Sequence, residues 1–133
     1  MISLKNTLKA ISTKIQALDT ALSVDYIVEQ GTSGVWTYRK WNSGIAECWG
    51  QVTASVYYGS SGYLTGGYYS SELTTEYPFT FTDTPAVQVS SLNKWNILLC
   101  VNPYESYMTT RWLAHQKQTR QTNHAVYIKG KWK

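Results

Sequence analysis

The sequence predicts a mainly β protein in which an N-terminal coiled-coil helix precedes an antiparallel β-sandwich head. Aromatic residues make up 14% of the 133 residues and charged residues only 15%, a composition that argues against disorder and suits strands. Apolar residues recur about every 3.5 positions in the first 24 residues, whereas from residue 25 onward the period is two. We therefore expect a stalk at 1–24 and a head at 25–133.

The stalk carries a heptad pattern. Its apolar positions, separated by 4, 3, 4, 3 and 4 residues, are Leu4, Leu8, Ile11, Ile15, Leu18 and Leu22. Because Ile at a d position is disfavoured in parallel dimers, the mixture of Ile and Leu predicts a homotrimer. The alternative is one amphipathic helix packed against its own domain, although such a helix usually has a wider apolar stripe. Met1 already fits the register, so the stalk is either truncated or naturally short.

The head is expected to consist of strands separated by turns. The predicted strands are 25–30, 35–41, 45–58, 78–82, 86–92, 95–101, 107–115 and 124–132. Turns are expected at 31–34 and 42–44, and a loop or loose hairpin at 59–73. A turn about every ten residues is typical of an antiparallel sandwich or barrel. Small side chains occupy the even positions from 46 to 56, so bulky residues should pack against that face.

Several protein classes are excluded by the sequence. The longest apolar stretch, Ile97 to Val101, is too short to cross a bilayer, and lysines interrupt the N-terminus, so we expect neither membrane insertion nor a secretory signal peptide. The cysteines Cys48 and Cys100 form no disulfide framework and no metal knuckle. They are either buried small apolar residues or partners in a single bridge.

The net charge of +4 is unevenly distributed. Residues 1–24 sum to +2, residues 25–110 to −4 and residues 111–133 to +6. The basic C-terminal stretch suits an anionic partner, or else a solvated strand pair whose charges keep its edge soluble. These basic residues are spread over 23 positions and match no nucleic-acid motif, so we expect no nucleic-acid partner.

Two segments resemble known families. The run DYIVEQGTSGVWTYRKWNSGIAECWG at 25–50 and the ending YIKGKWK at 127–133 resemble the C-terminal head of tail-fibre and minor tail proteins from phages of Gram-positive gut bacteria. The family commonly ends in IGRWK, from which Ile128-Lys129-Gly130-Lys131-Trp132-Lys133 is a small departure. The segments PFTF at 78–81 and PAVQVS at 85–90 are similar to the core of phage fibre tips and of H-type lectins, which are trimeric, sugar-binding β-sandwiches.

The resemblance implies a virion protein at the host-facing end of a phage tail. Such a protein is made in the bacterial cytoplasm, joins an upstream tail or baseplate protein and attaches to a host cell-surface glycan. The resemblance transfers no sugar-binding residue to this chain. The alternative functions are a purely structural tail component without a ligand and, less favoured, a polysaccharide-degrading tailspike domain.

Tyrosines in or beside loops are the candidate ligand-binding residues. A flat, amphipathic ring gives contact area at low entropic cost, and sugar rings stack on it. The candidates are Tyr57, Tyr58, Tyr63, Tyr68, Tyr69, Tyr104 and Tyr107. Alternatively, these tyrosines form cross-strand pairs and the trimer interface. The tryptophans expected in the core or an interface are Trp36, Trp41, Trp49, Trp95 and Trp132.

Candidate catalytic residues are few. His115 and His124 are nine positions apart and have no carboxylate at ligand spacing, so we expect no metal site and no cofactor. A glycosidase pair would have to come from the acidic residues Asp25, Glu29, Glu47, Asp83 and Glu105. Catalytic tailspikes are usually much longer chains, and we expect no enzymatic activity.

Overall fold

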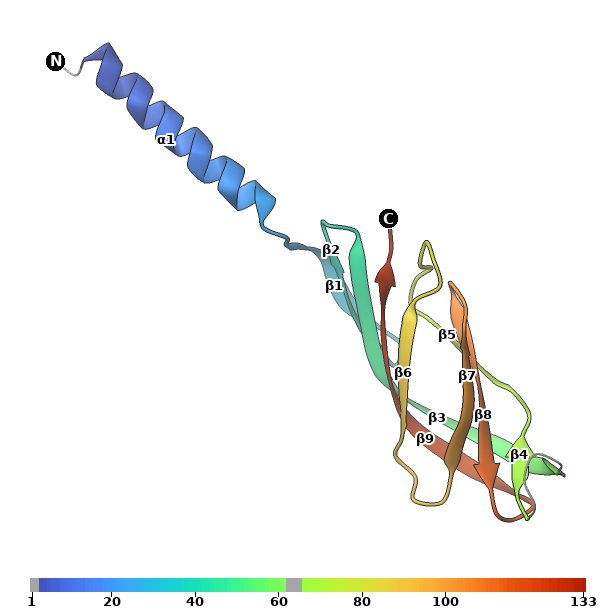
Figure 1. Cartoon of the computed structure of the whole chain (residues 1–133). Coiled ribbons are helices and arrows are strands. Elements are labelled where there is room, and N and C mark those ends of the chain that lie inside the picture. The colour runs from blue at the N-terminus through green and yellow to red at the C-terminus, as the bar shows by residue number, and fades with distance from the viewer. Residues whose placement is uncertain (1–2, 62–65) are drawn as a thin grey trace.

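A computed structural model describes residues 3–61 and 66–133, and its strands form one curled antiparallel sheet. Figure 1 shows the helix α1 (Leu4–Ser23) standing away from that sheet. The strands within the described residues are β1 (Ile27–Ser33), β2 (Trp36–Trp41), β3 (Ile45–Ser61), β4 (Tyr68–Ser70), β5 (Leu73–Glu76), β6 (Ala86–Ser91), β7 (Ile97–Pro103), β8 (Tyr107–Ala114) and β9 (Gln118–Lys131). The mainly β, antiparallel prediction is confirmed, whereas the sandwich and the trimer remain predictions.

The helix leaves its apolar seam uncovered by its own chain. Ser3 caps its start, because the Ser3 hydroxyl accepts a hydrogen bond from the Asn6 N–H at 3.3 Å. The described seam residues have exposed fractions from 49% to 74%: Leu4, Leu8, Ile11, Ile15 and Leu18. The side chain of Leu22 lies outside the described residues. Within one chain the helix therefore does not pack against the head, and the alternative of a docked amphipathic helix is wrong.

The two longest strands run the length of the head. β3 and β9 pair over 14 positions, from Ile45 opposite Lys131 to Tyr58 opposite Gln118. On its other edge β3 pairs first with β2 and then with β4, while β9 pairs on its other edge with β6. β8 pairs with β7 on one side and with β4 and β5 on the other, so β4 joins both parts of the sheet. Figure 1 shows this arrangement, with β7 lying between β6 and β8.

The core fills the inside of the curl. Small side chains on β3, among them Ala46 and Cys48, are fully buried. As predicted, bulky residues pack against them, including Trp36 of β2, Phe81 and Met108 of β8. A second cluster, toward the end of the head far from the helix, consists of Val56, Tyr58, Trp112 and Ala114. Alternation along β3 thus turns the even positions toward the core and most of the odd positions toward solvent, with the buried Glu47 as an exception.

The predicted strand at 78–82 is wrong. These residues form bends between two prolines, and they are anchored where the Phe81 N–H bonds the Glu105 carbonyl and the Thr82 N–H bonds the Lys131 carbonyl, at 2.9 and 2.8 Å. Phe79 and Phe81 have the spacing of a strand because both rings pack into the core. Their spacing of two residues therefore reflects the packing of a loop onto the core and not the pairing of a strand.

Other predicted boundaries shift. Gly31 to Ser33 belong to β1, and the turn falls instead at Gly34, whose φ of +58° favours glycine, and Val35. The range 59–73 holds the end of β3, all of β4 and the first residue of β5, and the last strand begins at Gln118 rather than at 124. These shifts lengthen the hairpins without changing the strand order.

Both cysteines are free, so the single-bridge alternative is wrong. Cys48 is buried, and this burial raises its pKa to about 12, which keeps the thiol protonated and unreactive. Cys100 is half-buried in β7.

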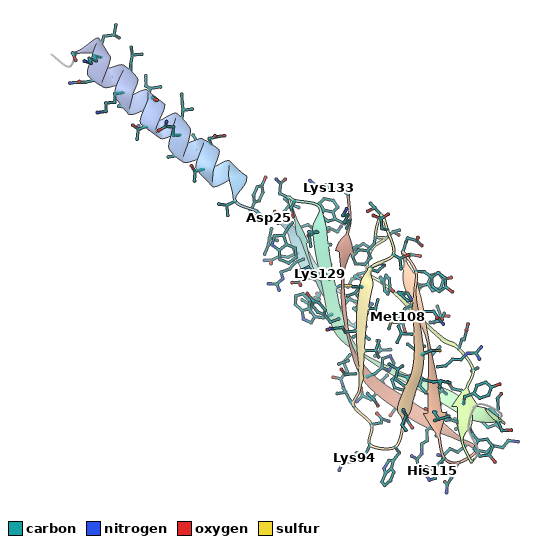
Figure 2. The ribbon with its side chains drawn as sticks, in the orientation of Figure 1. Asp25, Lys94, Met108, His115, Lys129 and Lys133 are labelled. Atoms are coloured by element: carbon teal, nitrogen blue, oxygen red, sulfur yellow. The ribbon has the colours of Figure 1, made fainter. Side chains whose placement is uncertain are left out.

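The basic residues of 111–133 do not form one patch. Because β9 spans the head, Lys117 and Arg120 lie at the end far from the helix, whereas Lys129 and Lys133 lie near Asp25 at the helix end (Figure 2). Figure 2 also shows Lys94 and His115 at the far end. Among the described residues, no helix is long and apolar enough to cross a membrane.

Candidate functional site

A recess of about 400 Å³ lies in the half of the head far from the helix, where β3, β4 and β8 meet. We call it the distal recess. Its lining residues are Tyr57, Gly59, Ser60, Tyr69, Ser70, Ser71 and Arg111. This volume falls within the usual range for small-ligand sites.

Strand alternation and a bulge position the β3 side of the distal recess. Tyr57 points to the outer face of the sheet and is 52% exposed, whereas its neighbour Tyr58 points into the core. A register shift between Tyr58 and Ser60 brings Ser60 opposite Tyr69 of β4. The Tyr57 ring lies over the Gly59 backbone, where any Cβ would overlap the ring. Glycine at 59 therefore gives the ring its place at the mouth of the recess.

The opposite wall combines an aromatic ring with a cation. The guanidinium carbon of Arg111 lies 5.8 Å from the centroid of the Tyr69 ring, a favourable cation–π distance. Arg111 Nη2 also lies 3.4 Å from Glu72 Oε1, with 32% and 48% of the two side chains exposed. Solvent screens such a half-exposed pair, so it is weak. The Tyr69 ring and Glu72 thus hold the guanidinium in place, but its ion pair with Glu72 is weak enough for another anion to replace it.

Buried hydrogen bonds fix the floor of the distal recess. The Ser70 hydroxyl donates to the Ser71 carbonyl at 2.8 Å and accepts from the Trp112 N–H at 3.0 Å. Ser70 and Trp112 are fully buried, so these bonds tie β4 firmly to β8. The recess thus offers two aromatic rings, serine hydroxyls and one guanidinium on a rigid support. Such a lining is suited to holding a sugar-sized polar ligand by stacking and hydrogen bonding.

The structure brings together only part of the predicted tyrosine set. Tyr57 and Tyr69 line the distal recess, and Tyr68 lies beside them, half-buried against the second core cluster. Tyr58 is a wrong prediction, because it has no exposed surface and burial raises its pKa to about 12. Tyr63 lies outside the described residues.

Tyr104 and Tyr107 lie at the other end of the head. Their rings stack with centroids 4.6 Å apart and an interplanar angle of 21°, at the turn between β7 and β8. Tyr69 pairs instead with Leu113, six residues farther along β8 and thus about 20 Å away at the rise of a strand. These two tyrosines therefore cannot contact a ligand held by Tyr57 and Tyr69.

Sequence reasoning missed Arg111 and the two serines Ser60 and Ser71. Strand alternation could predict that the Arg111 side chain points outward, but not which residues it meets. Its partners come from β3 and β4, which are distant in sequence. It also missed Trp112, which is fully buried. Among the predicted tryptophans, Trp36 is confirmed as a core residue, and its indole N–H donates to the Glu76 carbonyl at 2.9 Å. Trp95, by contrast, is 65% exposed.

Two of the acidic candidates lie in a second recess and are held by hydrogen bonds within the head. Asp25 and Glu47 line a second recess of about 290 Å³ near the helix end. Glu47 accepts from Arg39 at 2.5 Å and from the Tyr127 hydroxyl. Asp25 accepts from the Ser43 hydroxyl at 2.5 Å, which lowers the pKa of Asp25 and keeps it ionised. Both carboxylates thus act as local hydrogen-bond acceptors.

The remaining acids and the histidines also stay apart. Glu29, Asp83 and Glu105 are exposed. Within the described residues, no three His, Cys, Asp or Glu side chains gather as a metal site would require. His115 is exposed, whereas His124 is fully buried in the core.

No family model, curated protein or solved structure matches the chain.

Proposed function

We propose that this chain is the host-attachment tip of a phage tail fibre and binds a host cell-surface glycan in the distal recess. The observation that carries the proposal is the pairing of Tyr57 and Tyr69 with hydroxyl groups and a guanidinium in one recess. Aromatic rings stack on the C–H faces of sugars, while the polar groups bond to sugar hydroxyls. The chain acts by binding and not by catalysis.

The proposal includes a trimer of β-sandwich heads. The exposed seam from Leu4 to Leu18 supports it, since five large apolar residues on an isolated helix need partners. A helix of 20 residues is also marginal in water by itself. In the proposed sandwich, the two layers are the parts of the curled sheet that β4 joins. An upstream tail or baseplate protein then joins the stalk in the virion.

A trimer makes weak sites useful. Each further contact on the same surface is intramolecular, so overall binding can exceed single-site affinity by about 10² to 10⁴. The distal recess lies in the half of the head away from the helix, which suits display toward a cell (Figure 1).

A second candidate is a purely structural tail component. Apolar side chains at the helix end of the head favour it, since Tyr26, Ile27 and Val28 are 40% to 48% exposed. Such a surface fits contact with protein rather than with glycan. A connector of this kind would need no ligand in the distal recess.

The test removes both recess tyrosines. Tyr57→Ala with Tyr69→Ala should weaken single-site binding about thirtyfold, from about 1 kcal/mol for each stacked ring, and should therefore reduce the amount captured in pull-downs on cell walls of candidate hosts. The matched control removes the other pair, Tyr104→Ala with Tyr107→Ala, and should bind as the unchanged protein does. Periodate treatment of the walls should also abolish binding.

Three results would count against the proposal. Undiminished binding of the Tyr57 and Tyr69 variant would exclude the distal recess. Absence of binding to every wall would favour the structural component. Release of reducing ends from wall polysaccharide would instead show an enzyme.

A further inference from the structure

We infer that the ligand of the distal recess carries an anionic oxygen group, a carboxylate or a phosphate, on its sugar or polyol chain. The inference rests on the proposed function and names the ligand class of the same site. Three observations carry it: the state of Arg111, the lining of the distal recess and the charge of the surrounding half of the head.

Arg111 is placed to bind an anion. Its guanidinium lines the recess beside the Tyr69 ring, and its recorded ion pair, with Glu72, is long at 3.4 Å and half-exposed. A guanidinium binds carboxylate or phosphate through two parallel N–H···O bonds, which are stronger than a screened surface pair. An anionic ligand can therefore take over this guanidinium while its ring stacks on tyrosine.

The lining favours an anion over a cation. Among the described residues that line the distal recess, Arg111 is the one cation and there is no acidic side chain. The Ser60 and Ser71 hydroxyls add neutral hydrogen-bonding groups. Glu72 lies outside the lining, and an anion bound to Arg111 would compete with it. A neutral sugar offers the guanidinium only uncharged hydroxyl acceptors, whose hydrogen bonds to it are weaker than those of a carboxylate or phosphate.

The surrounding half of the head is positive. Lys94, Lys117 and Arg120 lie there with Arg111, and Glu72 is the one acid placed there among the described residues. The other acids of the chain lie in the helix or toward the helix end of the head: Asp19, Asp25, Glu29, Glu47, Glu76, Asp83 and Glu105. A half of the head with a net charge of about +3 concentrates anionic polymers before they dock.

The experiment compares matched probes on the full chain. Methyl glucuronide and methyl glucoside differ only at C6, and glucose 6-phosphate supplies the phosphate. Dissociation constants from NMR titration at low salt should be about tenfold to hundredfold lower for a charged probe than for methyl glucoside. The tighter of the two charged probes identifies whether carboxylate or phosphate is the natural source.

Variants assign the effect to one side chain. Arg111→Gln should abolish the preference for charged probes. Arg111→Lys should keep part of it, because lysine retains the positive charge but cannot donate two parallel hydrogen bonds. Lys117→Gln removes the same charge from an exposed turn of the same half and should keep the preference. Thermal melting confirms that each variant is folded.

Equal affinity for neutral and charged probes would overturn the inference, as would equal losses in Arg111→Gln and Lys117→Gln. If walls still bind and periodate still abolishes binding, only the anionic class is wrong. If neither walls nor any probe binds, the proposed function fails as well.

Discussion

Removal of His124 should make the head less sensitive to acid. His124 lies on β9, is fully buried and packs against the Trp112 ring with centroids 4.9 Å apart. Neither ring nitrogen has a hydrogen-bond partner among the described residues. Burial lowers its pKa, because the charged imidazolium would lose its hydration without gaining a partner.

The difference in the His124 pKa between the folded and the unfolded chain determines how the free energy of unfolding changes with pH. In the unfolded chain His124 takes up a proton near pH 6.5, whereas in the folded head it stays neutral to lower pH. Protonation thus favours the unfolded state below about pH 6.5. The free energy of unfolding should fall by up to about 1.4 kcal/mol between pH 7.5 and 5.5. Asp25 and Glu29 have lowered pKa values and so lose their stabilising effect in a more acidic range.

Urea denaturation at pH 7.5, 6.5 and 5.5, at one protein concentration, measures this loss. His124→Leu, which is similar in volume, should abolish the loss and leave stability at pH 7.5 unchanged or higher, since two unpaired polar atoms leave the core. His115→Leu is the control, because His115 is exposed. The reasoning would be refuted if the free energy of unfolding of the unchanged protein did not vary with pH over this range. It would also be refuted if the free energy of unfolding of His124→Leu fell with pH as steeply as that of the unchanged protein.

Two further changes test the stalk and the core. Ile11→Asp with Ile15→Asp should convert the proposed trimer to monomers in light scattering while the head keeps its strand content, because burying six unpaired carboxylates costs several kcal/mol per layer. Thr13→Asp with Thr20→Asp, on the outward face of the helix, should keep the oligomeric state of the unchanged protein. Gly130→Ala should destabilise the head by about 1 to 3 kcal/mol, since its Cβ would lie 2.9 Å from an aromatic ring carbon and a proline carbon; an unchanged denaturation midpoint would contradict this packing.

The sequence predicted local periodicity well and long-range partners poorly. The alternation from Ala46 to Val56 identified the core face of β3, because side-chain direction in a strand depends only on parity. The same alternation, continued from Val56, places Tyr58 in the core, where it is fully buried, whereas the sequence composition had grouped Tyr58 with the recognition loop. Phe79 and Phe81 led to the wrong prediction of a strand, because two loop residues that both pack into the core can also be spaced two positions apart.

The distal recess was only half predictable for the same reason. Tyr57 and Tyr69 stood out because they flank a glycine-rich stretch, but Arg111 meets them only because β4 pairs with both β3 and β8. That pairing is non-local, and no pattern within a single strand encodes it. Tyr104 resembled them in composition, yet strand direction places it at the opposite end.

The separation of seam and recess has a functional consequence. The described seam residues, in 4–18, are exposed and do not pack against the head, whereas the recess is built from β3, β4 and β8. Loss of the trimer should therefore leave the affinity of one recess for a soluble sugar unchanged, while attachment to cells falls by the avidity factor of about 10² to 10⁴. In the Ile11 and Ile15 double variant, attachment to cells should therefore fall while the single-site affinity stays the same. Were both to fall together, the recess would have to include a neighbouring head, and the single-chain site described above would be incomplete.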